Sequence, residues 1–281
     1  MAPRRQIERV LVSGACGGLG SAVTGLLAAR GITVFAADID AAALAQCAWP
    51  ANVVRLTLDV TDSPSVAAAV RVMASKGPAR TGESAPGLDG LVCCAGIFTG
   101  GPLAEASEES LLRAFDVNVM GAHRLVREAF PLLAQRAGTI VLISSESARF
   151  AMPFNGPYTV SKYALEAYAD CLRRELLLAG VAVAVVQPGS FRSGLLVNAG
   201  EVIDARGERS PFARQLHLVR RLLRREWESG MPADRVARVA VRALFAARPR
   251  ARYPVGNDRL RVLLRFLPAR LADAMIKVVM K

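Results

Sequence analysis

The feature that most constrains this chain is the alternation of short apolar runs with longer helical patterns, which repeats about every 30 residues over the first three quarters of the sequence. The apolar runs are nearly continuous, as in parallel strands that are covered on both faces. We therefore predict an α/β fold: a doubly wound parallel sheet of about seven strands in a single domain, with helices on both faces. The predicted strands span residues 10–13, 33–38, 53–58, 90–94, 139–144 and 181–187.

Several element ends are predicted by single residues. Ser63 followed by Pro64 predicts an N-cap and a first-turn proline for a helix over 66–74, and Gly180 predicts the end of a helix over 164–179. Residues 76–87 are rich in Gly, Pro, Ser and Thr, which predicts an exposed loop.

A glycine-rich turn joins the first predicted strand to a helix expected from about Ser21. Gly14, Gly18 and Gly20 allow a tight turn, let the backbone approach a pyrophosphate, and direct the first helical N–H groups at its negative charge. A glycine triplet alone is a weak signal, so an ordinary strand-to-helix turn is the alternative. The turn predicts a Rossmann-type dinucleotide site.

Asp38 ends the next predicted strand, 18 residues after Gly20. A carboxylate in this place accepts hydrogen bonds from the adenosine ribose hydroxyls. It would repel a 2′-phosphate, and neither Ala15 nor Cys16 supplies a compensating cation. The sequence therefore favours NAD over NADP, with an ordinary turn aspartate as the alternative.

Asp59 follows the third predicted strand. We predict that it accepts a hydrogen bond from the adenine amino group, with Val60 donating from its backbone. A helix-capping role for Asp59 is the alternative.

Three further polar residues are placed to meet at the carboxyl edge of the sheet. Tyr158 and Lys162 are four residues apart, so they share a face of the helix expected over 157–178. Ser145 lies thirteen residues before Tyr158, at the end of the strand over 139–144. Ligands bind at the carboxyl ends of parallel strands, where these side chains and a dinucleotide can converge.

Taken in order, these motifs resemble the short-chain dehydrogenase/reductase family in its single-domain form, closest to the steroid and retinol dehydrogenase-like branch. The resemblance covers about residues 8–195, and the ordered set is far more specific than any one motif. The matching residues are Ser13, Gly14, Gly18, Leu19, Gly20, Asp59, Val60, Cys93, Cys94, Ala95, Gly96, Asn118, Ser144, Ser145, Tyr158, Lys162, Pro188, Gly189 and Ser193. Two of these motifs depart from the family pattern, since Cys93-Cys94 replaces the usual Asn-Asn and Ser193 replaces the usual Thr.

The resemblance implies an NAD(P)-dependent oxidoreductase that exchanges a hydride between nicotinamide and a carbinol or carbonyl carbon. It implies Tyr158 as general acid/base, with its pKa lowered toward neutrality by Lys162 together with the oxidised nicotinamide. Lys162 would also hold the nicotinamide ribose. Ser145 would hydrogen-bond the substrate oxygen, and Asn118 would extend a proton relay from Lys162 through water. The implied cofactor contacts are Gly14, Gly18, Leu19, Gly20, Asp38, Asp59, Val60, Ala95, Gly96, Asn118, Tyr158, Lys162, Pro188, Gly189 and Ser193.

A non-catalytic dinucleotide-binding sensor or scaffold is an alternative function for this fold. Such proteins typically lose a catalytic residue, whereas Asn118, Ser145, Tyr158 and Lys162 are all present here. An enzyme is therefore favoured.

The segments that supply substrate contacts in this family are apolar here. They offer Phe150, Met152, Pro153, Phe154, Phe191, Leu195, Leu196, Val197 and Phe212. This lining favours a hydrophobic small-molecule substrate, hydroxysteroid-like or retinoid-like, over the alternative of a smaller polar alcohol. Glu146 and Arg149 either touch the substrate or form a salt bridge or solvated pair.

The net charge of +12 is unevenly distributed. Residues 1–200 carry 17 basic and 16 acidic side chains, whereas residues 201–281 carry 19 and 8. We interpret residues 1–200 as the NAD-binding and catalytic region and residues 201–281 as a substrate cap with a basic, helical C-terminal extension of the same domain. From Leu260 the extension is amphipathic, so it is either a cap or dimer contact or an interfacial helix on anionic lipid. Nucleic acid is excluded, because stacking aromatics and a recognition motif are missing.

The sequence also bounds the compartment. Its 5 cysteines are too few and too irregular for a disulfide framework, and its 2 histidines cannot build a usual zinc site, so we predict no metal. Neither a secretory signal nor a membrane span is visible, which favours the cytoplasm, with or without peripheral membrane contact. The family resemblance implies a homodimer or homotetramer.

Overall fold

The computed structural model describes residues 6–76, 86–194 and 210–280. Within them, seven strands form one sheet in the order β3-β2-β1-β4-β5-β6-β7, and every neighbouring pair is parallel. The strands are β1 (Arg9–Ser13), β2 (Thr33–Asp38), β3 (Val53–Thr57), β4 (Gly90–Cys93), β5 (Thr139–Ile143), β6 (Ala182–Pro188) and β7 (Arg252–Val255). The predicted doubly wound parallel sheet is confirmed, and its strand order reverses between β1 and β4.

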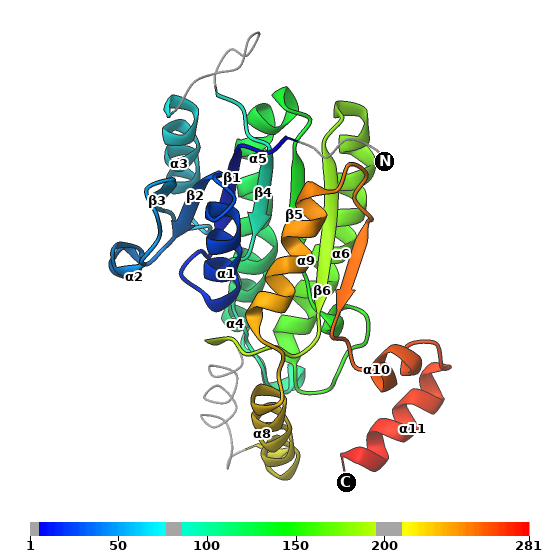
Figure 1. Ribbon diagram of the computed structural model, residues 1–281. Helices are drawn as coiled ribbons and strands as arrows, with labels where there is room; N and C mark the ends of the chain where they lie inside the picture. The colour runs from blue at the N-terminus through cyan, green and yellow to red at the C-terminus, as the bar shows by residue number, and fades with distance from the viewer. Residues whose placement is uncertain (1–5, 77–85, 195–209, 281) are drawn as a thin grey trace.

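Helices cover both faces of the sheet (Figure 1). The helices of the described residues are α1 (Gly18–Ala28), α2 (Ala41–Gln46), α3 (Ser63–Ser75), α4 (Glu108–Phe115), α5 (Gly121–Gln135), α6 (Gly156–Leu176), α8 (Ala213–Glu228), α9 (Ala233–Phe245), α10 (Arg259–Leu264) and α11 (Ala269–Val279). Short turns are η1 (Leu103–Glu105), the π-helical η2 (Asp116–Met120), η3 (Glu146–Ala148) and η4 (Leu177–Ala179).

Successive strand residues point to opposite faces, which divides the core into two layers. Leu11 and Leu91 pack in one layer with the apolar faces of α3, α5 and α6. Val10 and Val12 pack in the other layer with α1 and α9. Both faces of each central strand are therefore buried, which explains the continuous apolar runs in the sequence.

Two predicted helix ends have different outcomes. The predicted N-cap Ser63 is wrong: Asp62 caps α3, and its carboxylate accepts a hydrogen bond from Ser65 N at 3.0 Å. Two adjacent residues are both good caps, and the structure uses the stronger acceptor while Pro64 lies in the first turn. Gly180 does end the long helical segment, after the turn η4, with a left-handed φ of 69°.

The C-terminal part of the chain contributes to both the sheet and the region beyond it. Helix α9 packs on the sheet and β7 is its edge strand, whereas α8, α10 and α11 lie past the carboxyl ends of the strands (Figure 1). The predicted division at residue 200 stays a prediction, since it falls within 195–209, outside the described residues, as does most of the predicted loop over 76–87. None of the described helices combines the length and apolar character that a bilayer-spanning segment needs.

Candidate active site

A cavity of about 430 Å³ opens beyond the carboxyl ends of β1, β4, β5 and β6. This is the point where the strand order reverses, and open α/β sheets bind their ligands there. A volume of this size is typical of a small-molecule site. The predicted site residues that line it are Gly14, Gly18, Leu19, Gly20, Gly96, Ser145, Tyr158, Lys162, Pro188, Gly189 and Ser193.

Two glycines are required by the tight turn after β1. Gly14 has a left-handed φ of 65°, and a Cβ on it would lie 2.7 Å from Ala95 N. A Cβ on Gly20 would lie 2.0 Å from Gly14 O. A side chain at Gly14 would therefore push the turn away from the loop after β4, and one at Gly20 would clash with the turn itself.

The start of α1 forms an open cradle that faces the cavity. A Cβ on Gly18 would have Arg192 O, at 3.9 Å, as its nearest neighbour, so the space over the first turn is free. The first helical hydrogen bond runs from Ser21 N to Gly17 O, which leaves the amides of Gly18, Leu19 and Gly20 as donors for a ligand. This cradle, which a side chain would fill, fits the pyrophosphate of a dinucleotide.

Asp38 lies beside this cradle at the end of β2. Its Oδ2 accepts a hydrogen bond from Cys16 N at 2.9 Å, and its Oδ1 accepts one from Asp40 N at 3.2 Å. Cys16 lines the cavity, although Asp38 does not. Burial and the neighbouring Asp38 charge raise the pKa of the Cys16 thiol to about 12, so Cys16 is neutral and adds no charge beside the Asp38 carboxylate.

Asp59 lies outside the cavity lining. Its Oδ1 accepts hydrogen bonds from the backbone and hydroxyl of Thr61, at 2.8 and 2.7 Å. The alternative helix-capping role is wrong, because Asp62 caps α3. Val60 and Ala95 line a separate cavity of about 10 Å³. The predicted adenine contacts of Asp59 and Val60 stay predictions.

Asn118 lies in the π-helical turn η2 and is 2% exposed. Its Oδ1 accepts from Ile97 N at 2.9 Å, and its Nδ2 donates to Ile97 O at 3.0 Å and to Ser161 Oγ at 2.9 Å. Asn118 therefore joins the loop after β4 to α6. A Cβ on Gly96 would lie 3.1 Å from Asn118 Oδ1 and 3.7 Å from Lys162 Nζ, so these two polar groups border the same small space.

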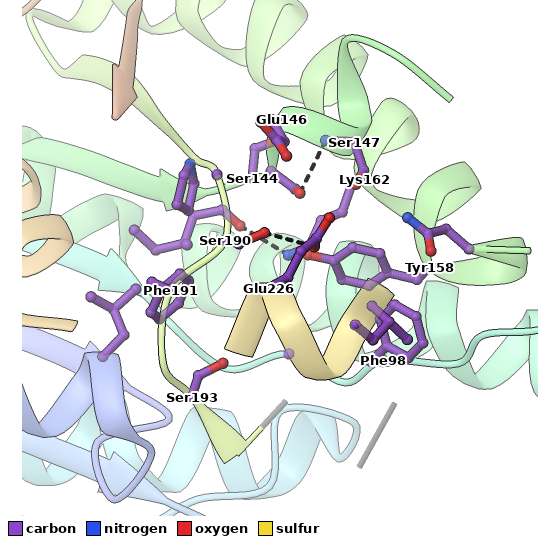
Figure 2. A pocket seen from close by; sticks show the side chains of 18 of the residues that line it. Phe98, Ser144, Glu146, Ser147, Tyr158, Lys162, Ser190, Phe191, Ser193 and Glu226 are labelled. Carbon is purple, nitrogen blue, oxygen red and sulfur yellow. Dashed lines mark hydrogen bonds between the residues drawn. The ribbon is translucent and has the colours of Figure 1, made fainter. Parts of the chain in front are cut away.

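Tyr158 and Lys162 lie one turn apart on α6, and both are buried (Figure 2). The Ser145 hydroxyl lies close enough to the Tyr158 side chain to lower the pKa of its phenol. Lys162 Nζ donates to Ile143 O at 2.9 Å and lies 5.7 Å from the centre of the Tyr158 ring. The structure thus brings the serine, tyrosine and lysine together at the edge of the sheet, as the sequence predicted.

Burial dominates the pKa values of Tyr158 and Lys162 in the chain alone. Burial raises the pKa of Tyr158, and the nearby Glu146 carboxylate raises it further, against the lowering effect of the Ser145 hydroxyl. In the chain alone, desolvation of the phenolate dominates. The predicted lowering by Lys162 and the oxidised nicotinamide concerns the cofactor-bound chain and stays a prediction. Burial also lowers the pKa of Lys162 from 10.5 to about 8.

Ser144 adds a polar group that the sequence reasoning left without a role. Its Oγ is buried, has no hydrogen-bond partner within the described part of the chain, and belongs to a residue that lines the cavity. An unpaired buried hydroxyl is costly, so a polar group of a bound molecule would satisfy it. Together with the open cradle of α1, it indicates that the cavity fits a nicotinamide dinucleotide.

The far side of the cavity is largely apolar. Of the predicted substrate contacts, Met152, Pro153 and Phe191 line it. Phe154 and Phe212 pack against the cluster that holds the Tyr158 ring, Phe150 does not line the cavity, and Leu195, Leu196 and Val197 lie outside the described residues. The apolar residues that sequence reasoning missed are Phe98, Val219, Leu222, Leu223 and Met280.

Sequence reasoning also missed most of a charged part of the lining. Glu146, Ser190, Glu226 and Arg261, which we call the charged wall, come from four separate segments (Figure 2 shows the first three). The Arg261 guanidinium pairs with both carboxylates. Of the two open alternatives for Glu146, the structure therefore contains a salt bridge, but to Arg261 on α10 and not to Arg149.

The described residues contain no group of three His, Cys, Asp or Glu side chains that could hold a metal ion. Cys93 is buried and Cys94 lines the cavity, and burial raises the pKa of both thiols. Neither cysteine is in a disulfide.

The chain is similar to known proteins over most of its length. A family model described as short chain dehydrogenase matches residues 8–202. The chain is 30% identical over 279 residues to the NADPH-dependent 3-dehydrocapnine reductase of Ornithobacterium rhinotracheale, covering 94% of each protein. It is 30% identical over 288 residues to retinol dehydrogenase 16 of Homo sapiens, covering 95% of this chain and 87% of the relative.

A solved structure resembles the whole fold. The short chain dehydrogenase/reductase from Burkholderia phymatum in complex with NAD matches with a TM-score of 0.78 and 25% sequence identity, covering 96% of this chain and 95% of that one.

Proposed function

Because the chain belongs to the short-chain dehydrogenase family and is an oxidoreductase that acts on CH–OH groups, we propose that it transfers a hydride between a nicotinamide dinucleotide and a hydrophobic secondary alcohol or ketone. One observation carries this proposal. The same cavity contains the glycine cradle at one end, Ser145 and Tyr158 in its wall, and an apolar lining beyond them. These are the three parts that such a reaction needs.

The nicotinamide, when bound, supplies the hydride acceptor or donor. The amides at the start of α1 would hold the pyrophosphate, and Lys162 would hold the nicotinamide ribose. The Ser145 hydroxyl donates a hydrogen bond to the substrate oxygen. Tyr158 Oη gives its proton to that oxygen in ketone reduction and removes it in alcohol oxidation. Burial raises the pKa of Tyr158, so at neutral pH it is the acid that ketone reduction requires.

A substrate panel tests this function. We expect lipophilic secondary alcohols, such as a hydroxysteroid and a long-chain 2-alkanol, to reduce the cofactor faster than a small polar diol, followed by absorbance at 340 nm. Faster turnover of the diol would contradict the hydrophobic substrate. Cofactor binding without turnover of any compound would instead support the alternative sensor or scaffold.

The NAD preference is a separate part of the proposal. The Asp38 carboxylate is held beside the cradle by two backbone amides, and a 2′-phosphate there would meet its negative charge. We expect kcat/KM to favour NAD over NADP, and Asp38→Asn to narrow the ratio by roughly tenfold to a hundredfold. A wild-type preference for NADP, as the name of the Ornithobacterium relative indicates for that enzyme, would refute this part.

The C-terminal arm, residues 259–280, supports membrane contact. Leu260, Leu263, Phe266, Val278 and Val279 are 56, 61, 69, 73 and 61% exposed. The exposed basic residues between and beside them are Arg259, Arg265, Arg270 and Lys277. An apolar face flanked by cations fits the interface of an anionic bilayer. We expect the full chain to sediment with vesicles that contain phosphatidylserine and to stay unbound with phosphatidylcholine alone.

A matched pair of variants tests the arm itself. Phe266→Glu should weaken sedimentation, whereas Leu178→Glu, at a 94% exposed site on η4, should leave it unchanged. Equal effects of both variants would refute a role for the arm. The predicted homodimer or homotetramer and the cytoplasmic location stay predictions.

A further inference from the structure

The charged wall forms one continuous hydrogen-bonded chain along the cavity. Ser190 Oγ donates to Glu226 Oε2 at 2.7 Å, and the Arg261 guanidinium donates to Glu226 Oε1. A second nitrogen of this guanidinium donates to Glu146 Oε1, and Asp258 N donates to Glu146 Oε2 at 2.9 Å. Each oxygen of both carboxylates therefore has a donor. The chain is complete without a ligand, and it joins four separate segments of the protein.

One end of the chain lies in the loop after β6. Ser190 directly follows Pro188 and Gly189, which are predicted cofactor contacts and line the cavity. Gly189 N donates to Val255 O at 2.9 Å, and a Cβ on Gly189 would lie 2.2 Å from Gly256 O. The loop after β6 therefore packs directly against the segment that leads from β7 into α10.

The other end of the chain is next to the predicted catalytic serine. Glu146 directly follows Ser145 and is 8% exposed. Ser145 caps the short turn η3, which Glu146 begins, and Ser145 Oγ accepts from Ser147 N at 3.1 Å. Because a single peptide unit joins Ser145 to Glu146, a fixed Glu146 carboxylate restrains the position of the Ser145 hydroxyl.

Arg261 connects the two ends through a planar group of fixed dimensions. Its two terminal nitrogens bind different carboxylates, one on η3 and one on α8. A guanidinium holds two such partners at a set spacing, whereas a lysine ammonium is a point charge on a flexible stem. Asp258 Oδ1 accepts from Arg261 N at 2.9 Å and so fixes the start of α10. Glu226 continues the apolar stripe of α8, Val219 and Leu223, along the cavity.

We propose that Arg261 is a positioning residue for hydride transfer: its guanidinium sets the spacing between the loop after β6, on the nicotinamide side, and Ser145, on the substrate side. This inference rests on the proposed function, because that function places the two reactants on these segments. Reacting atoms must lie about 3–3.5 Å apart, and a displacement of about 1 Å can cost about a hundredfold in rate. Arg261 belongs to the C-terminal arm, so the arm takes part in catalysis as well as in the proposed membrane contact.

The kinetic test uses Arg261→Lys, which keeps the charge but cannot span both carboxylates. The substrate is the secondary alcohol of the panel that the wild type oxidises fastest, with hydrogen or deuterium at its carbinol carbon. We expect kcat to fall roughly tenfold to a hundredfold, with KM for alcohol and cofactor within about threefold of the wild type. The full primary deuterium isotope effect should appear on kcat, because a slowed hydride transfer limits turnover.

Arg238→Lys is the matched control. Arg238 forms an exposed ion pair with Asp234 on α9, far from the charged wall in the contacts it makes, and its variant should turn over like the wild type. Wild-type turnover in Arg261→Lys would overturn the inference. So would a raised KM with unchanged kcat, because it would mean that Arg261 only anchors α10.

Ser190→Ala tests the other end of the chain. It removes the bond to Glu226 and should lower kcat in the same way as Arg261→Lys. Either change breaks the same chain, so the double variant should lose little more than the more damaging single variant. Losses that multiply would mean that the two residues act independently, and would contradict a chain that works as one unit.

Hydrogen exchange separates this inference from the proposed function, because it needs no turnover. In Arg261→Lys we expect faster amide exchange than in the wild type both in the loop after β6 and in η3. This result would support the connecting role of Arg261 even if no alcohol of the panel is oxidised. Faster exchange confined to residues 259–280 would overturn the inference, even if the panel confirms the proposed function.

Discussion

Lys162 should destabilise the cofactor-free chain, and Lys162→Met should relieve that cost. The residue is 6% exposed, and burial lowers its pKa from 10.5 to about 8. The folded chain therefore binds this proton more weakly than the unfolded chain does, so the charged lysine opposes folding. The penalty is complete below about pH 8 and disappears as the pH rises past about 10.5.

The size of the effect follows from these two pKa values. They correspond to about 3 kcal/mol at pH 7 and about 1 kcal/mol near pH 9.5. Methionine also leaves Ile143 O without the donor it has at 2.9 Å, which costs about 2 kcal/mol at any pH. Lys162→Met should therefore be about 1 kcal/mol more stable than the wild type at pH 7 and about 1 kcal/mol less stable near pH 9.5.

Urea unfolding of both proteins at the two pH values, without cofactor, measures this crossing. Lys76→Met, at an exposed position, is the control and should show no pH-dependent difference. A difference between Lys162→Met and the wild type that stays constant with pH would refute the reasoning, because it would mean that Lys162 titrates alike in the folded and unfolded chains. The same variant should lose at least about a hundredfold in turnover.

Three further predictions concern other parts of the molecule. Tyr158→Phe should bind the cofactor normally but lose at least about a hundredfold in kcat, and near-normal turnover would exclude Tyr158 as the acid/base. Gly14→Ala should lower the free energy of unfolding by roughly 1–3 kcal/mol, because residue 14 has a left-handed φ and the new Cβ would contact Ala95. Gly25→Ala, where a Cβ would have no neighbour within 4 Å, should not lower it and is the control. Thermal unfolding of both variants tests this difference. Arg252→Gln should cost about 2 kcal/mol at neutral pH. Arg252 lowers the pKa of Asp170, so the stabilisation from this ion pair is present above that carboxyl's ordinary pKa of 3.8 and is lost as the pH falls further. In acid unfolding, the variant should therefore lose less stability than the wild type.

The sheet and half of the site were predictable because their signals are local. Strand periodicity, the glycine turn at Gly14 and the spacing of Tyr158 and Lys162 each lie within a few neighbouring residues. Such signals survive folding, because backbone conformation and a shared helix face determine them. The order of the strands then brings Ser145 to the same edge.

The remaining features depend on distant contacts. Glu226 and Arg261 are 35 residues apart and meet only because α8 and α10 pack at the same end of the sheet. The signal that was available was a carboxylate at Glu226 on the continuation of the apolar stripe of α8. The raised pKa of Tyr158 likewise depends on burial by Phe98 and α8, which spacing alone does not reveal.

The π-helical turn η2 determines how the chain tolerates a change of length. It lies between α4 and α5, and it places Asn118 where its amide reaches both Ile97 and Ser161. Because its bonds run from residue i to i+5, this turn holds one residue more than an α-helical turn. Deleting one residue here would let the turn close as an ordinary α-helical turn, so Leu125 and Leu133 could stay buried against the sheet while Asn118 lost its bonds. The packing of α5 thus tolerates a change of length that the position of Asn118 does not.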